Sequence, residues 1–406
     1  MNTAPIFIVG VPRSGTTLLA ALLAAHSRMS CGPETHFFRY LAKVDPDSLC
    51  DKDTWPGPAL DFLYSVTYPS FSESDRKNLV EKYEVEKEHV EEYLTAREPR
   101  IANILSSVTE PYMRAMAKVR WVEKTPDHIK HVDLIRKYYP ESPIIRIQRD
   151  PRDVAVSLTK VPWGAPTFPE ALLFWKDFVE AREEFFSTDG KCYTLRYEDL
   201  ISSPVEELQK LCQFIGEDFE ETMLDTSFTG KQVNTQNVPW KEMASRPIDA
   251  SRLSIWRNEL TSQENQFAEA FLGDHLEKYG YPREESFNQL GEISPTFLLA
   301  VKYAHALERV TSKGVRFWKK DQAEKPAVTV YLGDPGDDQW LGYRKSERIV
   351  NVLSFLARMV KSWLTDHPVF WVSETSEDKW SGYFDYLIRR LLVTHKVTLD
   401  EAGQRS

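Results

Sequence analysis

The stretch PIFIVGVPRSGTT, residues 5–17, combines a short apolar run, a turn with two glycines and the start of a helical pattern. Its first part, residues 5–10, is rich in β-branched and aromatic side chains, which is typical of a buried parallel strand. The pattern after the turn predicts a helix over residues 15–26, with an apolar side formed by Leu18, Leu19, Leu22 and Leu23. A strand, a glycine turn and a helix in this order indicate an α/β domain.

The same alternation continues further along the chain. Buried-strand patterns are predicted at residues 119–123, 143–148 and 192–197, and helical patterns at about 127–139, 152–160, 168–187 and 203–215. This order predicts an α/β fold of the P-loop type, with three layers and a central, mostly parallel sheet. In such sheets ligands bind at the carboxyl ends of the strands, so the residues that follow each strand are the candidates for a site.

Composition excludes several classes of protein. The chain of 406 residues has 51 Lys and Arg against 61 Asp and Glu, and this acidic balance disfavours a nucleic-acid partner. No stretch approaches the roughly 18–20 apolar residues of a membrane span, and the first residues lack the pattern of a signal peptide. Four cysteines without a CxxC pair, and histidines without ligand spacing, predict a cytoplasmic protein with no metal site.

Gly10 to Thr17 follows the spacing of a phosphate-binding loop. Backbone N–H groups at such a helix start bind phosphate or sulfate. Thr16 stands where nucleotide triphosphatases carry lysine, and Arg13 inside the loop supplies the cation instead. A purely structural turn is the simpler alternative, but it requires neither the arginine nor the three hydroxyls of Ser14, Thr16 and Thr17.

A second motif, RDPRDVAVS at residues 149–157, follows the predicted strand 143–148 and opens a helix. Pro151 suits the first turn of that helix. Arg149 leaves the strand end and Ser157 lies two turns into the helix, so an arginine and a hydroxyl could bind a second anion there.

PRSGTTLL at 12–19 together with RDPRDVAVS at 149–157 resembles the sulfotransferases that use 3′-phosphoadenylyl sulfate (PAPS), over roughly residues 4–283. The resemblance implies that the first motif binds the 5′-phosphosulfate through Arg13, Ser14, Gly15, Thr16 and Thr17. It implies that Arg149 and Ser157 bind the 3′-phosphate and that Tyr197, in LRYEDL, lies near the nucleotide.

The general base is not the histidine of the small-molecule branch, because Lys124-Thr125 is followed by Pro126. CGPET at 31–35 instead resembles a segment of the tyrosylprotein sulfotransferases, and Glu34 lies 21 residues after Arg13, as the catalytic glutamate does in that branch. The resemblance therefore implies Glu34 as the base, with His36 and Glu123 as lesser candidates.

Three further assignments rest on the same resemblance. Lys124 matches a lysine that holds the bridging oxygen between phosphate and sulfate, and Ser254, in LSIW, matches a serine that donates near the sulfate. A glycine-rich loop that binds the 3′-phosphate in other relatives is missing, and Arg246 and Arg252 are candidates to replace it.

The predicted organisation is a PAPS-binding domain at 1–285 and a C-terminal extension at 286–406, read as a small α/β or helical appendage. Residues 55–118 form a helical insertion, either a solvated one or a cap over the acceptor, and residues 230–250 read as a surface loop. The implied function is transfer of a sulfuryl group to an acceptor hydroxyl or, less favoured, an amine. The acceptor is a carbohydrate, lipid, metabolite or peptide, and a homodimer is compatible with the sequence.

Two alternatives belong to other classes. A P-loop kinase or nucleotidase predicts dependence on ATP and Mg²⁺, and the missing loop lysine weighs against it. A catalytically silent nucleotide-binding scaffold predicts binding of adenosine 3′,5′-bisphosphate without turnover. The presence of Arg13, Glu34, Lys124, Arg149 and Ser157 weighs against the scaffold.

Overall fold

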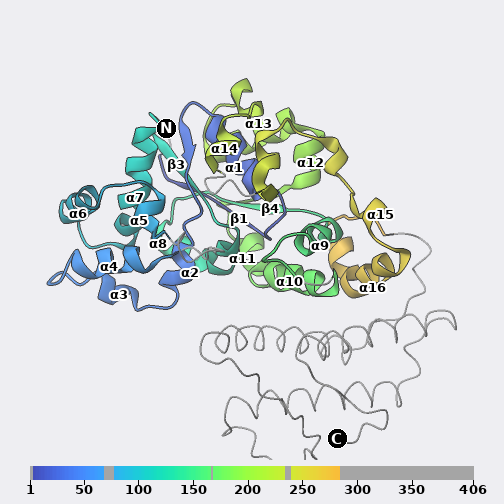
Figure 1. Cartoon of the computed structure of the whole chain (residues 1–406), viewed down its shortest axis with the longest axis horizontal. Coiled ribbons are helices and arrows are strands. Elements are labelled where there is room, and N and C mark those ends of the chain that lie inside the picture. Colours follow the sequence, from blue (N-terminus) through green and yellow to red (C-terminus); the bar gives the residue numbers. More distant parts are fainter. Residues whose placement is uncertain (1–2, 68–76, 166–167, 234–238, 284–406) are drawn as a thin grey trace, which may run out of the picture. The chain divides into compact units, whose positions relative to one another are not determined.

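Five parallel strands form one central sheet in the computed structural model of the chain (Figure 1). The structure describes residues 3–67, 77–165, 168–233 and 239–283. The chain divides into two compact units, residues 1–260 and 261–406, and the sheet belongs to the first. The predicted α/β class with a parallel sheet is confirmed.

The strand order is β2-β3-β1-β4-β5. Strand β1 (Ile6–Gly10) lies in the middle, with Ile8 opposite both Lys124 and Ile145. The predicted strands are confirmed as β1, β3 (Arg120–Lys124), β4 (Ile144–Gln148) and β5 (Cys192–Arg196). Strand β2 (Met29–Cys31) was not predicted, because a strand of three residues is too short to show a period.

The two faces of β1 are buried in different cores. Ile6 and Ile8 pack with the leucines of α1 (Thr16–Ala25) and with the apolar side of α13 (Pro204–Ile215). Phe7 points to the opposite face, where its ring contacts Trp121 and Tyr139 at 5.7 and 5.1 Å between centroids. A strand with both faces buried explains why residues 5–10 are apolar without alternation.

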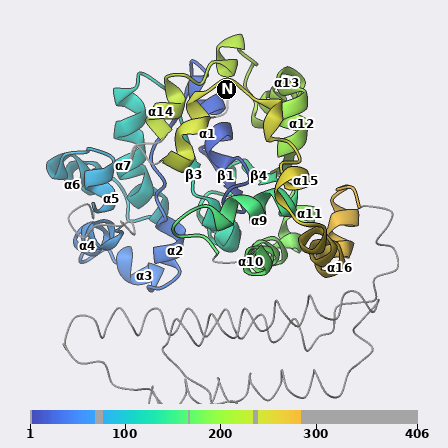
Figure 2. The same ribbon diagram turned by 45° about the vertical axis from the view of Figure 1, so that its right-hand side comes forward.

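Helices cover both faces of the sheet, as Figures 1 and 2 show. On one side lie α1, α12 (Tyr197–Ser202), α13 and α14 (Thr229–Val233). On the other lie α9 (Pro151–Thr159), α10 (Phe168–Glu180) and α11 (Glu183–Thr188). The helix predicted at 168–187 is divided into two helices, α10 and α11. The helix predicted at 127–139 begins as a 3₁₀ helix, η2 (Pro126–His131), and continues as α8 (Val132–Tyr138).

The segment between β2 and β3 is helical over its described residues. It carries α2 (Phe37–Leu41), α3 (Pro46–Leu49), α4 (Gly57–Ser65), α5 (Leu79–Lys82), α6 (Lys87–Thr95) and α7 (Ile101–Ala115). Each of these helices buries apolar side chains and exposes charged ones, and the choice between a solvated insertion and an acceptor cap at 55–118 stays open.

The described part of the predicted surface loop at 230–250 contains short helical turns, although most of its side chains are exposed or half-buried. Helix α14 and the 3₁₀ helix η4 (Pro239–Ser245) fold against each other, and Val233 and Ala244 are buried. A methyl group on Gly230 would lie 2.3 Å from the carbonyl oxygen of Ala244, which shows how closely the two turns pack. Such irregular turns have no period that a sequence pattern could reveal.

Short elements complete the described chain: η3 (Glu221–Leu224), η5 (Ala250–Arg252), α15 (Trp256–Glu259) and, in the second unit, α16 (Ser262–Lys278). Thr261 and Glu264 form a capping box at the start of α16. The extension predicted at 286–406 lies outside the described residues, so its boundary and structure stay predictions. Within the described ranges no helix is both long and apolar enough to cross a membrane.

Candidate active site

The loop between β1 and α1 is shaped to bind an anion. Helix α1 begins at Thr16, and Gly15 at its N-cap has φ 98° and offers no side-chain cap, so the first N–H groups of this ten-residue helix are left for a ligand. A methyl group on Gly15 would lie 2.5 Å from Cδ2 of Tyr197. Both the backbone conformation and the Tyr197 ring therefore require glycine here.

Arg13 joins the two predicted motifs. Its φ of 77° is unusual for a residue with a side chain, and its Nε donates to Ser157 Oγ at 3.0 Å. Arg149 Nη1 donates a long hydrogen bond of 3.5 Å to the carbonyl oxygen of Arg13, which brings the Arg149 guanidinium to the loop. Residues more than 130 positions apart in the chain thus form one cluster.

Positive charge is concentrated in this cluster. Burial, together with the charges of Arg149 and Arg252 and against an opposing effect of Glu34, lowers the pKa of Arg13 to about 10. An anion bound among these three cations would offset their mutual repulsion. The cluster is therefore an electrostatic match for phosphate or sulfate.

Arg149 is held in place by three neighbours. Its Nη2 donates to Asp153 Oδ2 at 3.1 Å and to the carbonyl oxygen of Arg252 at 2.7 Å, and the guanidinium lies 4.4 Å from the centre of the Tyr197 ring. Its Nε is buried and has no hydrogen-bond partner within the described structure. The same is true of Ser14 Oγ in the loop. Buried donors without partners are costly unless a ligand binds them.

Most of the predicted donor residues line one pocket of the first unit. These are Arg13, Gly15, Thr16, Thr17, Arg149, Ser157 and Tyr197, together with Arg246 and Arg252. Ser14 is buried beneath the loop. Sequence reasoning missed the apolar part of the wall, formed by Met243, Ala244, Pro247, Ile248 and Ile255, because no motif marks these residues.

Glu34 lies on a turn between β2 and α2, the base turn (Gly32–His36). Its carboxylate forms an ion pair with Lys124, the last residue of β3, which is only 1% exposed. The second carboxylate oxygen is 3.6 Å from His36 Nε2, and His36 Nδ1 is 3.4 Å from Asp127 Oδ1. Burial opposes ionisation of Asp127, yet bonding to His36 and the charge of His36 lower the pKa of Asp127 to about 2. Glu34 and Lys124, the predicted base and the predicted leaving-group residue, are thus direct partners.

Glu123, a lesser candidate for the base, is used inside the protein. One of its oxygens lies 3.0 Å from His128 Nδ1, and the other accepts from Thr35 Oγ1 at 2.7 Å and from Thr125. Both Glu123 and His128 are fully enclosed. A buried carboxylate with this set of partners helps to fix the base turn, and its candidacy as the base stays a prediction.

Three of the predicted catalytic residues, Glu34, Lys124 and Ser254, do not line the pocket that holds the predicted donor residues. Ser254 also has no contact with the Glu34–Lys124 pair among the bonds of the described structure. It lies between η5 and α15 with φ 52°, and it is absent from the pocket wall, whereas its neighbours Arg252 and Ile255 are part of it. The role of Ser254 near the sulfate stays a prediction.

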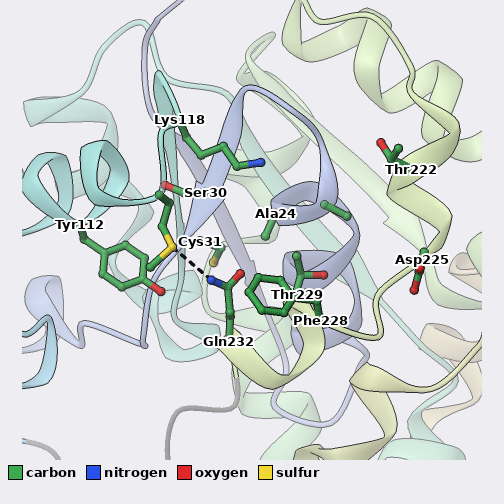
Figure 3. Close-up of a pocket in the computed structure, with 12 residues that line it drawn as sticks. Ala24, Ser30, Cys31, Tyr112, Lys118, Thr222, Asp225, Phe228, Thr229 and Gln232 are labelled. Carbon is green, nitrogen blue, oxygen red and sulfur yellow. Dashed lines mark hydrogen bonds between the residues drawn. The ribbon is translucent and has the colours of Figure 1, made fainter.

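A second pocket lies beside strand β2, with a volume of about 340 Å³ (Figure 3). Ser30, Cys31 and Tyr112 form one wall and helix α14 with Phe228 and Gln232 the other. None of the predicted site residues lines it.

All four cysteines are free thiols, and within the described ranges no group of three or more His, Cys, Asp and Glu side chains could hold a metal ion.

Residues 5–221, which include the loop, the base turn and the second motif, match the model of a family described as the sulfotransferase family. The chain belongs to the sulfotransferase family. It is similar to nodulation protein NoeE of Sinorhizobium fredii, with 25% identity over 68% of this chain and 65% of that protein. It is also similar to a putative protein-tyrosine sulfotransferase of Caenorhabditis briggsae, with 29% identity over 62% of this chain and 80% of that protein.

The match to curated relatives is partial for some of them. The chain spans 65% of the length of NoeE and 30% of an uncharacterized protein of Aquifex aeolicus that is 25% identical. Among solved structures, the sulfotransferase domain from the Synechococcus PCC 7002 olefin synthase aligns with 70% of this chain and 97% of its own, at 23% identity and a TM-score of 0.47.

Proposed function

We propose that this member of the sulfotransferase family transfers a sulfuryl group from PAPS to an acceptor hydroxyl. The observation that supports it most is the contact between Arg13 and Ser157, which brings the two anion-binding motifs into one pocket with Arg149. A donor with a 5′-phosphosulfate and a 3′-phosphate needs two such anion sites side by side. The products would be a sulfate ester and adenosine 3′,5′-bisphosphate.

The residues present fit this donor. Arg13, Thr16, Thr17 and the N–H groups of α1 would hold the 5′-phosphosulfate, and Arg149 with Ser157 the 3′-phosphate. The buried Nε of Arg149 and Oγ of Ser14 would gain partners. Arg246 and Arg252, in the same wall, would add charge in place of the missing glycine-rich loop.

The chemical step assigns opposite roles to the Glu34–Lys124 pair. Glu34 accepts the proton of the acceptor hydroxyl while the acceptor oxygen attacks sulfur in line, and the bond between sulfur and the bridging oxygen breaks. Lys124 stabilises the charge that develops on the bridging oxygen. Lys124 is paired with Glu34 in this structure. If the Lys124 ammonium group instead binds the bridging oxygen of the donor, the Glu34 carboxylate becomes available to act as a base. No covalent enzyme intermediate is required.

The acceptor is assigned here only by class: the hydroxyl of a carbohydrate, lipid, metabolite or peptide. Protein-tyrosine sulfotransferases are among the similar proteins, which supports a phenolic hydroxyl as one probe. Of the first two aromatic residues that follow the second motif in the sequence, Trp163 is exposed and Phe168 is buried. Four free cysteines agree with the reducing cytoplasm as its location.

Calorimetric titration with adenosine 3′,5′-bisphosphate in EDTA tests the donor site. We expect binding without metal, and a loss of about 2 kcal/mol or more in Arg149→Ala, because charge-assisted hydrogen bonds are lost. Arg257→Ala is the matched control, since Arg257 carries the same charge nearby but lies outside the pocket wall. Failure to bind the bisphosphate, combined with Mg²⁺-dependent binding of ATP, would overturn the proposal in favour of a kinase.

A further inference from the structure

The base turn is held from the side of the helical insertion by two consecutive residues. Lys82, at the end of α5, donates from Nζ to the carbonyl oxygen of Glu34 at 2.5 Å. Tyr83 donates from its hydroxyl to the carbonyl oxygen of Pro33 at 2.8 Å. Two successive carbonyl groups of the turn are therefore fixed by one short segment of the insertion.

The Tyr83 ring also sets the path of the turn. A methyl group on Gly32 would lie 2.5 Å from Cε1 and 2.8 Å from the hydroxyl oxygen of this ring, so Gly32 allows the backbone to lie directly against it. Tyr83 is 3% exposed, and burial raises its pKa well above the usual value, so the hydroxyl keeps its proton and stays a donor. Its ring packs edge-on against Tyr112 of α7 at 5.4 Å.

The opposite side of the turn is held by the sheet. The N–H of Thr35 donates to Thr125 Oγ1 at 3.0 Å, and the Thr35 hydroxyl donates to Glu123. Backbone groups at residues 33, 34 and 35 are thus bonded from two directions. The Glu34 carboxylate is left to exchange between Lys124 and an acceptor, while the backbone that carries it stays fixed.

We propose that Tyr83 and Lys82 are positioning residues for Glu34, and that the helical insertion thereby sets the place of the base. This inference rests on the proposed function. It gives the helical insertion a part in the chemical step. Neither interpretation of residues 55–118 from the sequence, a solvated insertion or a cap over the acceptor, implies such a part. A displacement of about 1 Å at a reacting group can cost up to roughly 100-fold in rate. Loss of one bond to the turn is therefore expected to lower kcat and to leave the donor pocket unchanged.

Tyr83→Phe is the decisive variant, because it removes one hydroxyl and keeps the ring against Gly32. Tyr112→Phe is its matched control, the same change in the ring that packs on Tyr83. The assay follows ³⁵S from labelled PAPS to p-nitrophenol, to N-acetyltyrosine amide and to water. We expect kcat to fall 10- to 100-fold in Tyr83→Phe, with the Kd of adenosine 3′,5′-bisphosphate within twofold of wild type. Tyr112→Phe should change neither value.

A second measurement needs no acceptor. Hydrogen–deuterium exchange of a peptide covering residues 31–37 should become faster in Tyr83→Phe and in Lys82→Met but not in Tyr112→Phe. Unchanged exchange in Tyr83→Phe, or a kcat equal to that of Tyr112→Phe, would overturn the positioning role. Failure of the proposed function itself would look different, since wild-type protein would then neither bind the bisphosphate nor release label from PAPS.

Discussion

Ser157 serves two purposes in the donor pocket. It accepts from Arg13 Nε, and it is part of the pocket wall, where we propose that it binds the 3′-phosphate. The unusual backbone conformation of Arg13 makes this contact important, because a residue with positive φ depends on its surroundings to hold it. The hydroxyl of Ser157 on α9 therefore helps to fix the loop that carries Arg13, although the two residues are 144 positions apart in the sequence.

We expect Ser157→Ala to weaken binding of adenosine 3′,5′-bisphosphate by roughly 10- to 100-fold, since hydrogen bonds to charged groups contribute about 1.5–3 kcal/mol. Thr159→Ala is the control on the same helix, because its hydroxyl donates to the carbonyl oxygen of Val156 instead. Calorimetry on both variants measures the difference. Equal affinities for the two variants would contradict the role of Ser157.

The residues with motif signals were predictable, and their partners were not. Arg13, Arg149 and Ser157 stand at fixed places in two recognisable segments. The ring of Tyr197 against Gly15, the Asp127–His36 contact and the bonds from Lys82 and Tyr83 join segments far apart in sequence. Such contacts depend on tertiary packing, which no local spacing encodes.

At the scale of elements, α14 and η4 connect the pocket beside β2 with the donor pocket. Helix α14 contributes Thr229 and Gln232 to the pocket beside β2, and η4 contributes Met243 and Ala244 to the donor pocket. Thr229 also donates to the carbonyl oxygen of Ala21 in α1 at 2.8 Å. Because Gly230 of α14 packs closely on Ala244 of η4, we expect the two elements to move together.

Gly230→Ala is expected to displace η4 from the donor pocket. The added methyl group meets the Ala244 carbonyl at 2.3 Å, and overpacking of this kind costs about 1–3 kcal/mol. Both stability to urea and affinity for the bisphosphate should fall. Gly190→Ala is the control, because nothing lies within 4 Å of its added methyl group, and it should change stability by less than about 0.5 kcal/mol. A Gly230→Ala protein that binds as tightly as wild type would show that η4 does not shape the pocket.

Elements with a clear hydrophobic pattern were predicted from the sequence, and the shortest elements were not. Strand β1 is a continuous apolar run, β3 and β4 are buried over their whole length around apolar residues, and helix α13 has a clear apolar side. Strand β2 has three residues, and α14 has five. Elements this short obtain their stability from the packing around them, so their own sequence carries little signal.

For the whole molecule, the residues that line the donor pocket lie within one unit although they span the sequence from Arg13 to Ile255. The family match at 5–221 covers the loop, the base turn and the second motif. The order of the strands in the sheet could not be derived from local patterns, since it depends on which distant segments pair. The assignment of PAPS binding to residues 1–285, with residues 286–406 as a separate extension, stays a prediction.

A protein truncated after residue 285 tests that division. We expect it to bind adenosine 3′,5′-bisphosphate with a Kd within about twofold of the full chain, because all residues of the donor pocket are retained. Calorimetry on the two proteins, with circular dichroism to verify folding, makes the comparison. Folded but much weaker-binding protein would show that the extension contributes to the donor site.

The place of β1 in the sheet has a consequence for the growing chain on the ribosome. Strand β1 is made first, yet its neighbours β3 and β4 begin at Arg120 and Ile144. The apolar run of residues 6–10 therefore leaves the exit tunnel long before the strands that cover its edges are made. Pairing it closes long loops, which slows folding. During synthesis this segment is the natural place for a chaperone to bind.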